Sequence, residues 1–257
     1  MAWAAPWLED WHELARDCAS SDWRTALNAK AHALGLVNAR GLPLHFVAQH
    51  ELPEGAAYEA FIDKTGRVPT RANLHDFFNA LVWLSYPKIK RTLNAIQARE
   101  LAANGIQQTR GSTRDAATLF DENAVLFACA DSELAEVLRT HEWEALFVAR
   151  RSAFGTQYGV FPFGHALLEK LTAPFKAITA HAWIVEVEAD FFVLPREQQR
   201  AHLDQLVSQQ VRTGLPGRGF TPLPVLGVPG WSAGQVAEYY RDRDVFRPKR
   251  VKANLEH

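Results

Sequence analysis

The sequence predicts an α+β fold: a helix-rich single domain with a small antiparallel or mixed sheet. Two long segments, residues 74–85 and 88–103, carry apolar residues at helical spacing. Short β-prone runs, several bounded by glycine or turn residues, predict strands near residues 44, 58, 125, 158 and 184. We expect the domain to span residues 1–254, and residues 255–257 look like the remnant of an affinity tag.

Composition and charge narrow the class of protein. Among 257 residues, 47% are hydrophobic and 22% charged, which is typical of a folded protein with a sizeable core. The formal net charge of -1 gives no general attraction for nucleic acid or an anionic membrane, and no apolar run approaches the ~20 residues that span a bilayer. Cys18 and Cys129 are too few for a disulfide scaffold, and the N-terminus lacks the pattern of a secretory signal. We therefore expect a cytoplasmic protein with no membrane partner.

The helix expected over residues 74–85 organises the rest of the chain. A core-facing stripe at i, i+3, i+4 and i+7 is formed by Leu74, Phe77, Phe78 and Leu81. Asn73 is suited to cap the first turn, and Pro87 disfavours a helical conformation at Tyr86. His75 and Asn79 project to one side, just beside the apolar stripe, so we expect them at the margin of the core.

A second polar strip follows on the helix expected over residues 88–103. Lys90, Asn94 and Gln97 lie at i, i+4 and i+7, and the short connection predicts that the two helices are neighbours. If the helices form a hairpin, the polar strips converge and Arg71 joins them. Fixed donors beside an imidazole suit an anion or a phosphate group. The alternative is that these groups cap helix ends and tie the hairpin to neighbouring loops.

Two further groups of residues suggest metal or proton chemistry. Asp121 and Glu122 stand just before the apolar run 124–129 and offer oxygen ligands to a divalent cation, although such residues more often serve a turn. His165 and Glu169 are one helical turn apart and are able to share a metal ion, to exchange a proton, or to form a surface hydrogen bond.

These patterns define the candidate site. The candidate catalytic residues are His75, Asp76, Asn79, Asp115, Asp121 and His165. The candidate substrate-binding residues are Arg71, Lys90, Asn94 and Gln97, and the candidate metal ligands are Asp121 and Glu122. The leading hypothesis is a hydrolase or transferase that acts on a phosphorylated or otherwise anionic small molecule, with a divalent metal ion as the cofactor.

Two other functions stay open, and with them the question of whether the protein is an enzyme. In a non-catalytic binding or assembly module the polar strips are structural, and Trp3, Trp7 and Trp11 serve a homodimer contact. A nucleic-acid protein would use Lys88, Lys90 and the basic tail near residues 241–252, but interleaved acidic residues in that tail argue against it.

Familiar catalytic motifs are missing from the sequence: it has no Walker loop, dinucleotide fingerprint, paired CxxC or HExxH. The doublet His75-Asp76 matches that of HD-type metal phosphohydrolases, but that fold is all-helical and the strands expected here depart from it.

Four groups of motifs carry a closer resemblance, which extends over about residues 7–248. They are Val68-Pro69-Thr70-Arg71 with residues 73–83; Arg114-Asp115-Ala116 with residues 118–123; Phe163-Gly164-His165-Ala166-Leu167; and residues 224–231. The chain resembles the uncharacterised bacterial family known as domain of unknown function 3025. The resemblance implies one family unit in Gram-negative bacteria, and it implies no particular reaction, substrate or catalytic residue.

Overall fold

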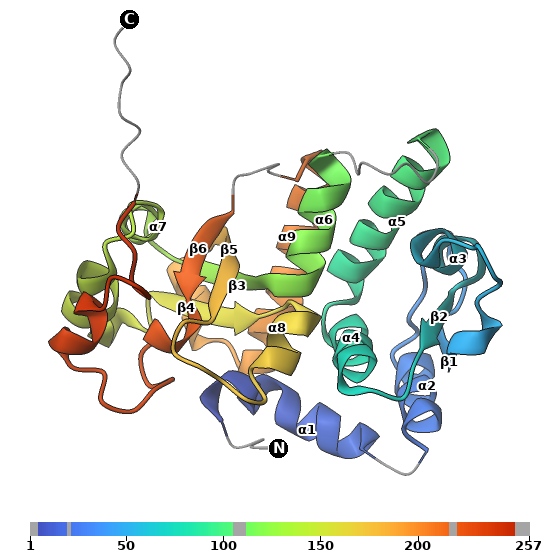
Figure 1. The fold of residues 1–257 in the computed structure, drawn as a ribbon, viewed down its shortest axis with the longest axis horizontal. Coiled ribbons are helices and arrows are strands. Elements are labelled where there is room, and N and C mark those ends of the chain that lie inside the picture. Colours follow the sequence, from blue (N-terminus) through green and yellow to red (C-terminus); the bar gives the residue numbers. More distant parts are fainter. Residues whose placement is uncertain (1–4, 20–21, 105–111, 216–219, 250–257) are drawn as a thin grey trace, which may run out of the picture.

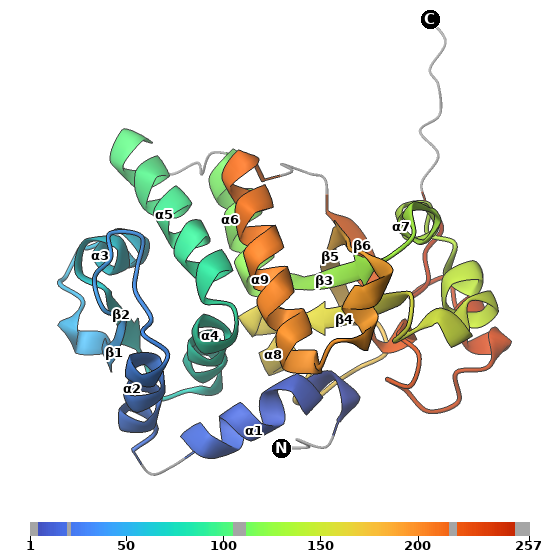
Figure 2. The same cartoon turned by 180° about the vertical axis from the view of Figure 1, so that it is seen from behind.

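The computed structural model describes residues 5–19, 22–104, 112–215 and 220–249, and it confirms a helix-rich α+β fold. Figures 1 and 2 show helices at the centre, a four-stranded sheet on one side and a two-stranded sheet on the other. The helices are α1 (Glu9–Cys18), α2 (Trp23–Ala33), α3 (Tyr58–Thr65), α4 (Leu74–Ser85), α5 (Pro87–Asn104), α6 (Ser112–Asn123), α7 (Ser132–Arg139), α8 (His165–Lys170) and α9 (Arg196–Thr213). Within the described ranges, no helix combines the length and apolar character needed to cross a membrane.

The larger sheet is mixed, which is one of the two arrangements, antiparallel or mixed, that the sequence predicts. Its strands are β3 (Ala124–Cys129), β4 (Tyr158–Pro162), β5 (Thr179–Glu186) and β6 (Thr221–Pro224), in the order β4-β3-β5-β6. The central pair β3 and β5 is parallel, and each is antiparallel to its outer neighbour. Every residue of β3 is buried, which explains why this strand is an unbroken apolar run.

The sheet separates two apolar cores. Leu126 of β3 and Val185 of β5 belong to a core shared with α4, α5 and α9. Val125 of β3 and Ala182 of β5 belong to a second core with α7 and the segment Ala145–Ala149. Alternate residues of one strand therefore serve opposite faces, and the first core fixes the helices that carry the candidate site.

The smaller sheet corrects the strand predicted near residue 58. Tyr58 begins α3, which connects β1 (His45–Ala48) to β2 (Arg67–Thr70), and these strands pair in parallel. A parallel pair needs a crossover of this kind, so the predicted strand is wrong. Gly66, at φ 72°, ends α3 in the left-handed conformation, and the residues before it form the last helical turn.

The strand β6 is not among the strands predicted from the sequence. It contains Pro222 and Pro224, which lack the N–H group that a strand interior needs and therefore conceal a strand in the sequence. Because β6 lies at the edge of the sheet and pairs on one side with β5, a missing N–H on its other side costs nothing.

The prediction that α4 and α5 are neighbours is confirmed, since the two helices are in contact and Tyr86 alone connects them. The Asn73 side chain accepts a hydrogen bond from the Asp76 N–H at 2.8 Å, as an N-cap does, and Pro87 opens α5. Asp204 of α9 accepts the backbone N–H groups of Lys88 and Ile89 at 3.1 and 2.9 Å. A neighbouring helix therefore caps the start of α5 and fixes the side on which Lys90 points.

Candidate metal centre

Three helices bring two histidines and three carboxylates together. His75 lies in the first turn of α4, Asp121 and Glu122 lie in the last turn of α6, and His165 and Glu169 lie on α8. In Figure 1, α6 runs directly into β3, and α8 lies beside α4 and below α6. Because Asp121 and Glu122 are helical rather than in a turn, they point about 100° apart. One carboxylate thus faces α5, and the other faces the histidines.

The Nε2 atoms of the two histidines face each other. They are 3.1 Å apart, and the rings meet edge to face with centroids 4.6 Å apart. A carboxylate oxygen of Glu122 lies 3.4 Å from Nε2 of His165 and 4.0 Å from Nε2 of His75. Ligand atoms around a tetrahedral zinc ion are about 3.3 Å apart, given Zn–N bonds of about 2.0–2.1 Å. His75, His165 and Glu122 thus form a cluster with metal-ligand spacing.

Glu169 determines which nitrogen of His75 is free. Its carboxylate lies 2.9 Å from Nδ1 of His75, and an ionised carboxylate only accepts hydrogen bonds. The proton of the neutral ring is therefore on Nδ1, and Nε2 presents a lone pair toward His165 and Glu122. Carboxylates arranged in this way orient histidine ligands in many metal sites.

His165 is buried and neutral. Only 4% of its surface is exposed, and burial, partly opposed by Asp121, lowers its pKa to about 4. Among the described residues, no side-chain hydrogen bond is formed by Nδ1 of this ring, and a carboxylate oxygen of Asp121 lies 3.8 Å away. With the proton on Nδ1 facing that carboxylate, Nε2 adds a second lone pair to the one from His75 and to the Glu122 carboxylate. A cation between them would satisfy these lone pairs, as would a proton on one Nε2 atom that is then donated to the other across 3.1 Å.

A buried ion pair lies next to the cluster. Lys90 Nζ donates to both carboxylate oxygens of Asp121, at 2.6 and 2.8 Å, and to the side-chain oxygen of Asn79 at 2.8 Å. Asn79 in turn donates to the Tyr58 hydroxyl at 3.1 Å. Burial raises the pKa of Asp121, but this pKa lies below its ordinary value, chiefly because the Lys90 ammonium attracts the carboxylate and hydrogen-bonds to it.

The other candidate residues lie outside this cluster. Arg71 donates to both carboxylate oxygens of Asp76, at 3.1 and 2.9 Å. Asn94 donates to the backbone and carboxylate oxygens of Glu59, at 2.9 and 2.6 Å. Arg71 and Asn94 therefore already hold anionic partners within the chain.

Two more candidates lie further along their helices. Gln97 is buried one turn beyond Asn94 on α5. Asp115 is exposed and lies about two helical turns before Glu122 on α6. The structure thus brings His75, Asn79, Lys90, Asp121, Glu122 and His165 together, and leaves Arg71, Asp76, Asn94, Gln97 and Asp115 around them.

Two residues of the site have roles that the sequence did not reveal. The spacing along α8 suggests Glu169 as a partner of His165, but Glu169 hydrogen-bonds to His75. Helical spacing predicts which face of its helix a residue occupies, and it does not predict the partner on another helix. Gly164 packs against the backbone between the ligands, where an added Cβ would lie 2.5 Å from the carbonyl oxygen of Glu122 and from the amide nitrogens of Asn123 and Ala124. A glycine before the first helical residue is the signal that could have indicated it.

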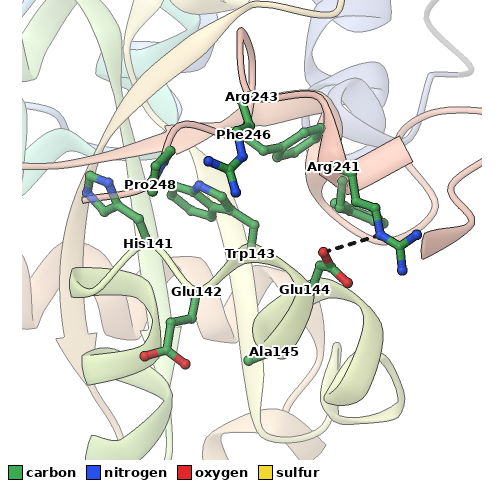
Figure 3. A pocket seen from close by; sticks show the side chains of 10 residues that line it. His141, Glu142, Trp143, Glu144, Ala145, Arg241, Arg243, Phe246 and Pro248 are labelled. Atoms are coloured by element: carbon green, nitrogen blue, oxygen red, sulfur yellow. Dashed lines mark ion pairs between the residues drawn. The ribbon is translucent and has the colours of Figure 1, made fainter. Parts of the chain in front are cut away.

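A separate hollow of about 670 Å³ lies at the second core (Figure 3). Residues of the 141–145 loop and of the C-terminal segment line it: His141, Glu142, Trp143, Glu144, Ala145, Tyr240, Arg241, Arg243, Phe246 and Pro248. Arg241 pairs with Glu144 at 3.7 Å, and Trp143 donates to the Arg247 carbonyl at 2.8 Å. This hollow shares no lining residue with the histidine cluster.

A comparison with protein families shows to which family the chain belongs. The sequence model of DUF3025, described as a protein of unknown function, matches residues 44–250, so the chain belongs to this family. The matched region includes both histidines, Glu122 and Glu169. No curated protein and no solved structure matches the chain.

Proposed function

We propose that this member of DUF3025 is an enzyme that depends on one divalent metal ion, held by Nε2 of His75, Nε2 of His165 and the carboxylate of Glu122. The observation that carries the proposal is the convergence of these atoms, within 4.8 Å of one another, from three helices. Two imidazoles and a carboxylate match the ligands of catalytic zinc sites.

The exposure of the ligands favours a catalytic ion over a structural one. The His165 side chain is 5% exposed, whereas those of His75 and Glu122 are 30% and 38% exposed. The cluster is thus closed on the side of the core and open toward solvent. A structural zinc ion usually has four protein ligands, and three ligands leave a position for water or substrate.

The chemistry follows from an ion with one open side. A divalent ion lowers the pKa of bound water and polarises a substrate oxygen. Held by His75, His165 and Glu122, the ion would supply this activation. As water or a hydroxyl group adds to a phosphorus or carbonyl carbon, the bond to the leaving oxygen would break, and that oxygen would take up the proton lost by the attacking group. Water as the acceptor makes the enzyme a hydrolase, and the hydroxyl of a second substrate makes it a transferase.

The charge pairs within the chain affect how a substrate would bind. Lys90 and Arg71 already hold Asp121 and Asp76, so the anionic part of the substrate would meet the metal ion first. We therefore propose a phosphorylated or otherwise anionic small molecule, bound from the open side at His75 and Glu122. A bacterial, cytoplasmic location belongs to the same proposal.

One observation supports a non-catalytic binding or assembly module as the second candidate. Much of the polar strip is satisfied internally, through the pairs Lys90–Asp121, Asn94–Glu59 and Asn79–Tyr58. In such a module the metal ion would join α4, α6 and α8, and no turnover would follow.

Elemental analysis of the purified protein tests the metal site. We expect about one equivalent of zinc or another divalent ion per chain, removable by a chelator and restored on reloading. Because a ligand at a hundredfold excess over its dissociation constant stabilises the fold by about 2.7 kcal/mol, metal should also raise the melting temperature of the stripped protein. Absence of both effects would overturn the proposal.

A screen of the metal-loaded protein then separates enzyme from module. We expect phosphorylated metabolites to raise its melting temperature, and at least one phosphoester to be hydrolysed by the loaded protein and not by the stripped one. Metal binding without any turnover, and a His75→Ala variant that loses stability alone, would favour the module.

A further inference from the structure

We propose that Lys90 and Asp121 are positioning residues that fix the ring of His165, so that its Nε2 faces the metal ion. The inference rests on the proposed metal site. It gives a role to a buried ion pair that touches neither solvent nor the open side of the cluster.

Charge and distance connect the pair to the ligand. Nδ1 of His165 is buried and forms no side-chain hydrogen bond within the described part of the chain, and Asp121 Oδ2 lies 3.8 Å from it. The same carboxylate is held at both oxygens by Lys90. The side chains of Lys90, Asp121 and His165 are only 5%, 10% and 5% exposed. The carboxylate therefore favours the proton on Nδ1 of His165, which leaves Nε2 free for the ion.

The Lys90 ammonium has no remaining donor for a substrate. Its three N–H groups are matched by three acceptors, two oxygens of Asp121 and one of Asn79. The ring of Trp83 covers it at 5.4 Å from the ring centroid. Lys90 thus acts through Asp121, and not by contact with an anion.

Stability alone is a poor explanation for this pair. Two charges lose their hydration on burial, and replacing such a pair with apolar residues is often neutral or stabilising. The pair Glu169–His75 shows what the arrangement achieves at the other ligand, where the carboxylate is 2.9 Å from Nδ1. We infer that Asp121 serves His165 as Glu169 serves His75, with Lys90 holding the carboxylate in place.

Zinc affinity of the full-length protein, measured by competition with a chromophoric chelator, tests the inference. We expect Asp121→Asn, Lys90→Met and the double variant each to lose about 10–100-fold in affinity, the usual effect of removing a group that orients a ligand. The double variant should lose no more than the larger single effect, because the two residues act as one unit. Cobalt substituted for zinc should show an altered visible spectrum in each variant.

Glu59→Gln is the matched control. Glu59 is also a carboxylate in this layer of helices and is held by Asn94, but no contact joins it to either histidine among the described residues. Its variant should keep the zinc affinity and the cobalt spectrum. If Lys90→Met fails to fold, the other two variants, Asp121→Asn and the double variant, decide the outcome. The double variant removes both charges and so leaves none of the pair uncompensated.

The outcomes separate this inference from the proposed function. If the wild-type protein binds no zinc, both the proposed metal centre and the positioning role are ruled out. Suppose instead that the wild-type protein binds zinc, and that Asp121→Asn and the double variant bind it as tightly and give the same cobalt spectrum. The positioning role alone is then ruled out, and the metal centre stands.

Discussion

The histidine cluster and the hollow of Figure 3 both gather charged and aromatic side chains, but they differ in which groups face one another. In the hollow, Arg241 pairs with Glu144, and the rings of His141 and Trp143 stack with centroids 5.1 Å apart. In the cluster, Nε2 of His75 faces Nε2 of His165 at 3.1 Å, with the Glu122 carboxylate beside both. The hollow of about 670 Å³ thus brings opposite charges together, whereas the cluster brings together two imidazole nitrogens and a carboxylate oxygen, which are atoms that a cation binds.

This difference shows which property indicates a site. A hollow with internally paired charges gains little from a charged ligand, because binding has to break those pairs. Hydrogen-bond acceptors that face each other, in contrast, are stabilised by a cation that binds between them. The orientation of lone pairs is therefore a better guide to function in this protein than the volume of a cavity.

Removal of a histidine ligand should have the largest effect. We expect His165→Ala to reduce the metal content from about one equivalent to near zero, a loss beyond the ~100-fold in affinity typical of an orienting group. Glu144→Gln, which breaks the ion pair in the hollow, should keep the metal content of wild type. Elemental analysis after gel filtration measures both, and full occupancy in His165→Ala would break the comparison.

Two glycine substitutions sharpen the comparison. Gly164→Ala would place a Cβ 2.5 Å from the backbone of Glu122, whereas Gly227→Ala would meet the ring edges of Phe246 and Phe147 at 2.7 and 3.0 Å. We expect each to lower the free energy of unfolding of the stripped protein by about 1–3 kcal/mol, measured by urea denaturation. Only Gly164→Ala should also weaken zinc binding, because it separates the ligand-bearing segments. Equal zinc affinities in the two variants would contradict this.

The orienting carboxylate should have a smaller effect. Glu169→Gln retains an oxygen that accepts from Nδ1 of His75 but removes its charge. We expect zinc affinity to fall about tenfold, with the unfolding midpoint of the stripped protein unchanged. Glu142→Gln, an exposed residue at the hollow, is the control and should leave the affinity as it is.

The smallest expected effect is on the stability of the fold at low pH, through His141 in the hollow. Burial lowers the pKa of His141 from its ordinary value of 6.5, so the folded ring takes up a proton less readily than the unfolded one. The stability from this group is present above pH 6.5 and is lost as the pH falls below it. We expect His141→Asn, which suits the local φ of 61°, to lose less stability than wild type on acidification. Urea denaturation of the stripped proteins at about pH 7.5 and about pH 5.5 measures the difference, and equal losses would count against it.

Local signals in the sequence determined much of the architecture. The apolar stripe of residues 74–85, the cap at Asn73 and the proline at Pro87 predicted α4 and α5, because helical period and capping depend on residues a few positions apart. The apolar run 124–129 predicted β3 for the same reason. Tyr58 was misread as part of a strand, because short apolar segments fit either structure until packing selects one.

The sequence by itself therefore determined the α+β class, the two neighbouring central helices and a set of candidate polar residues that includes His75, Asp121, Glu122 and His165. Only the tertiary structure decided that Glu169 binds His75, that Lys90 binds Asp121, and that the two imidazoles face each other. These pairings join residues 31 to 94 positions apart. They depend on how α4, α5, α6 and α8 cross, which is set by the packing of their apolar faces and leaves no mark in the local pattern of polar residues.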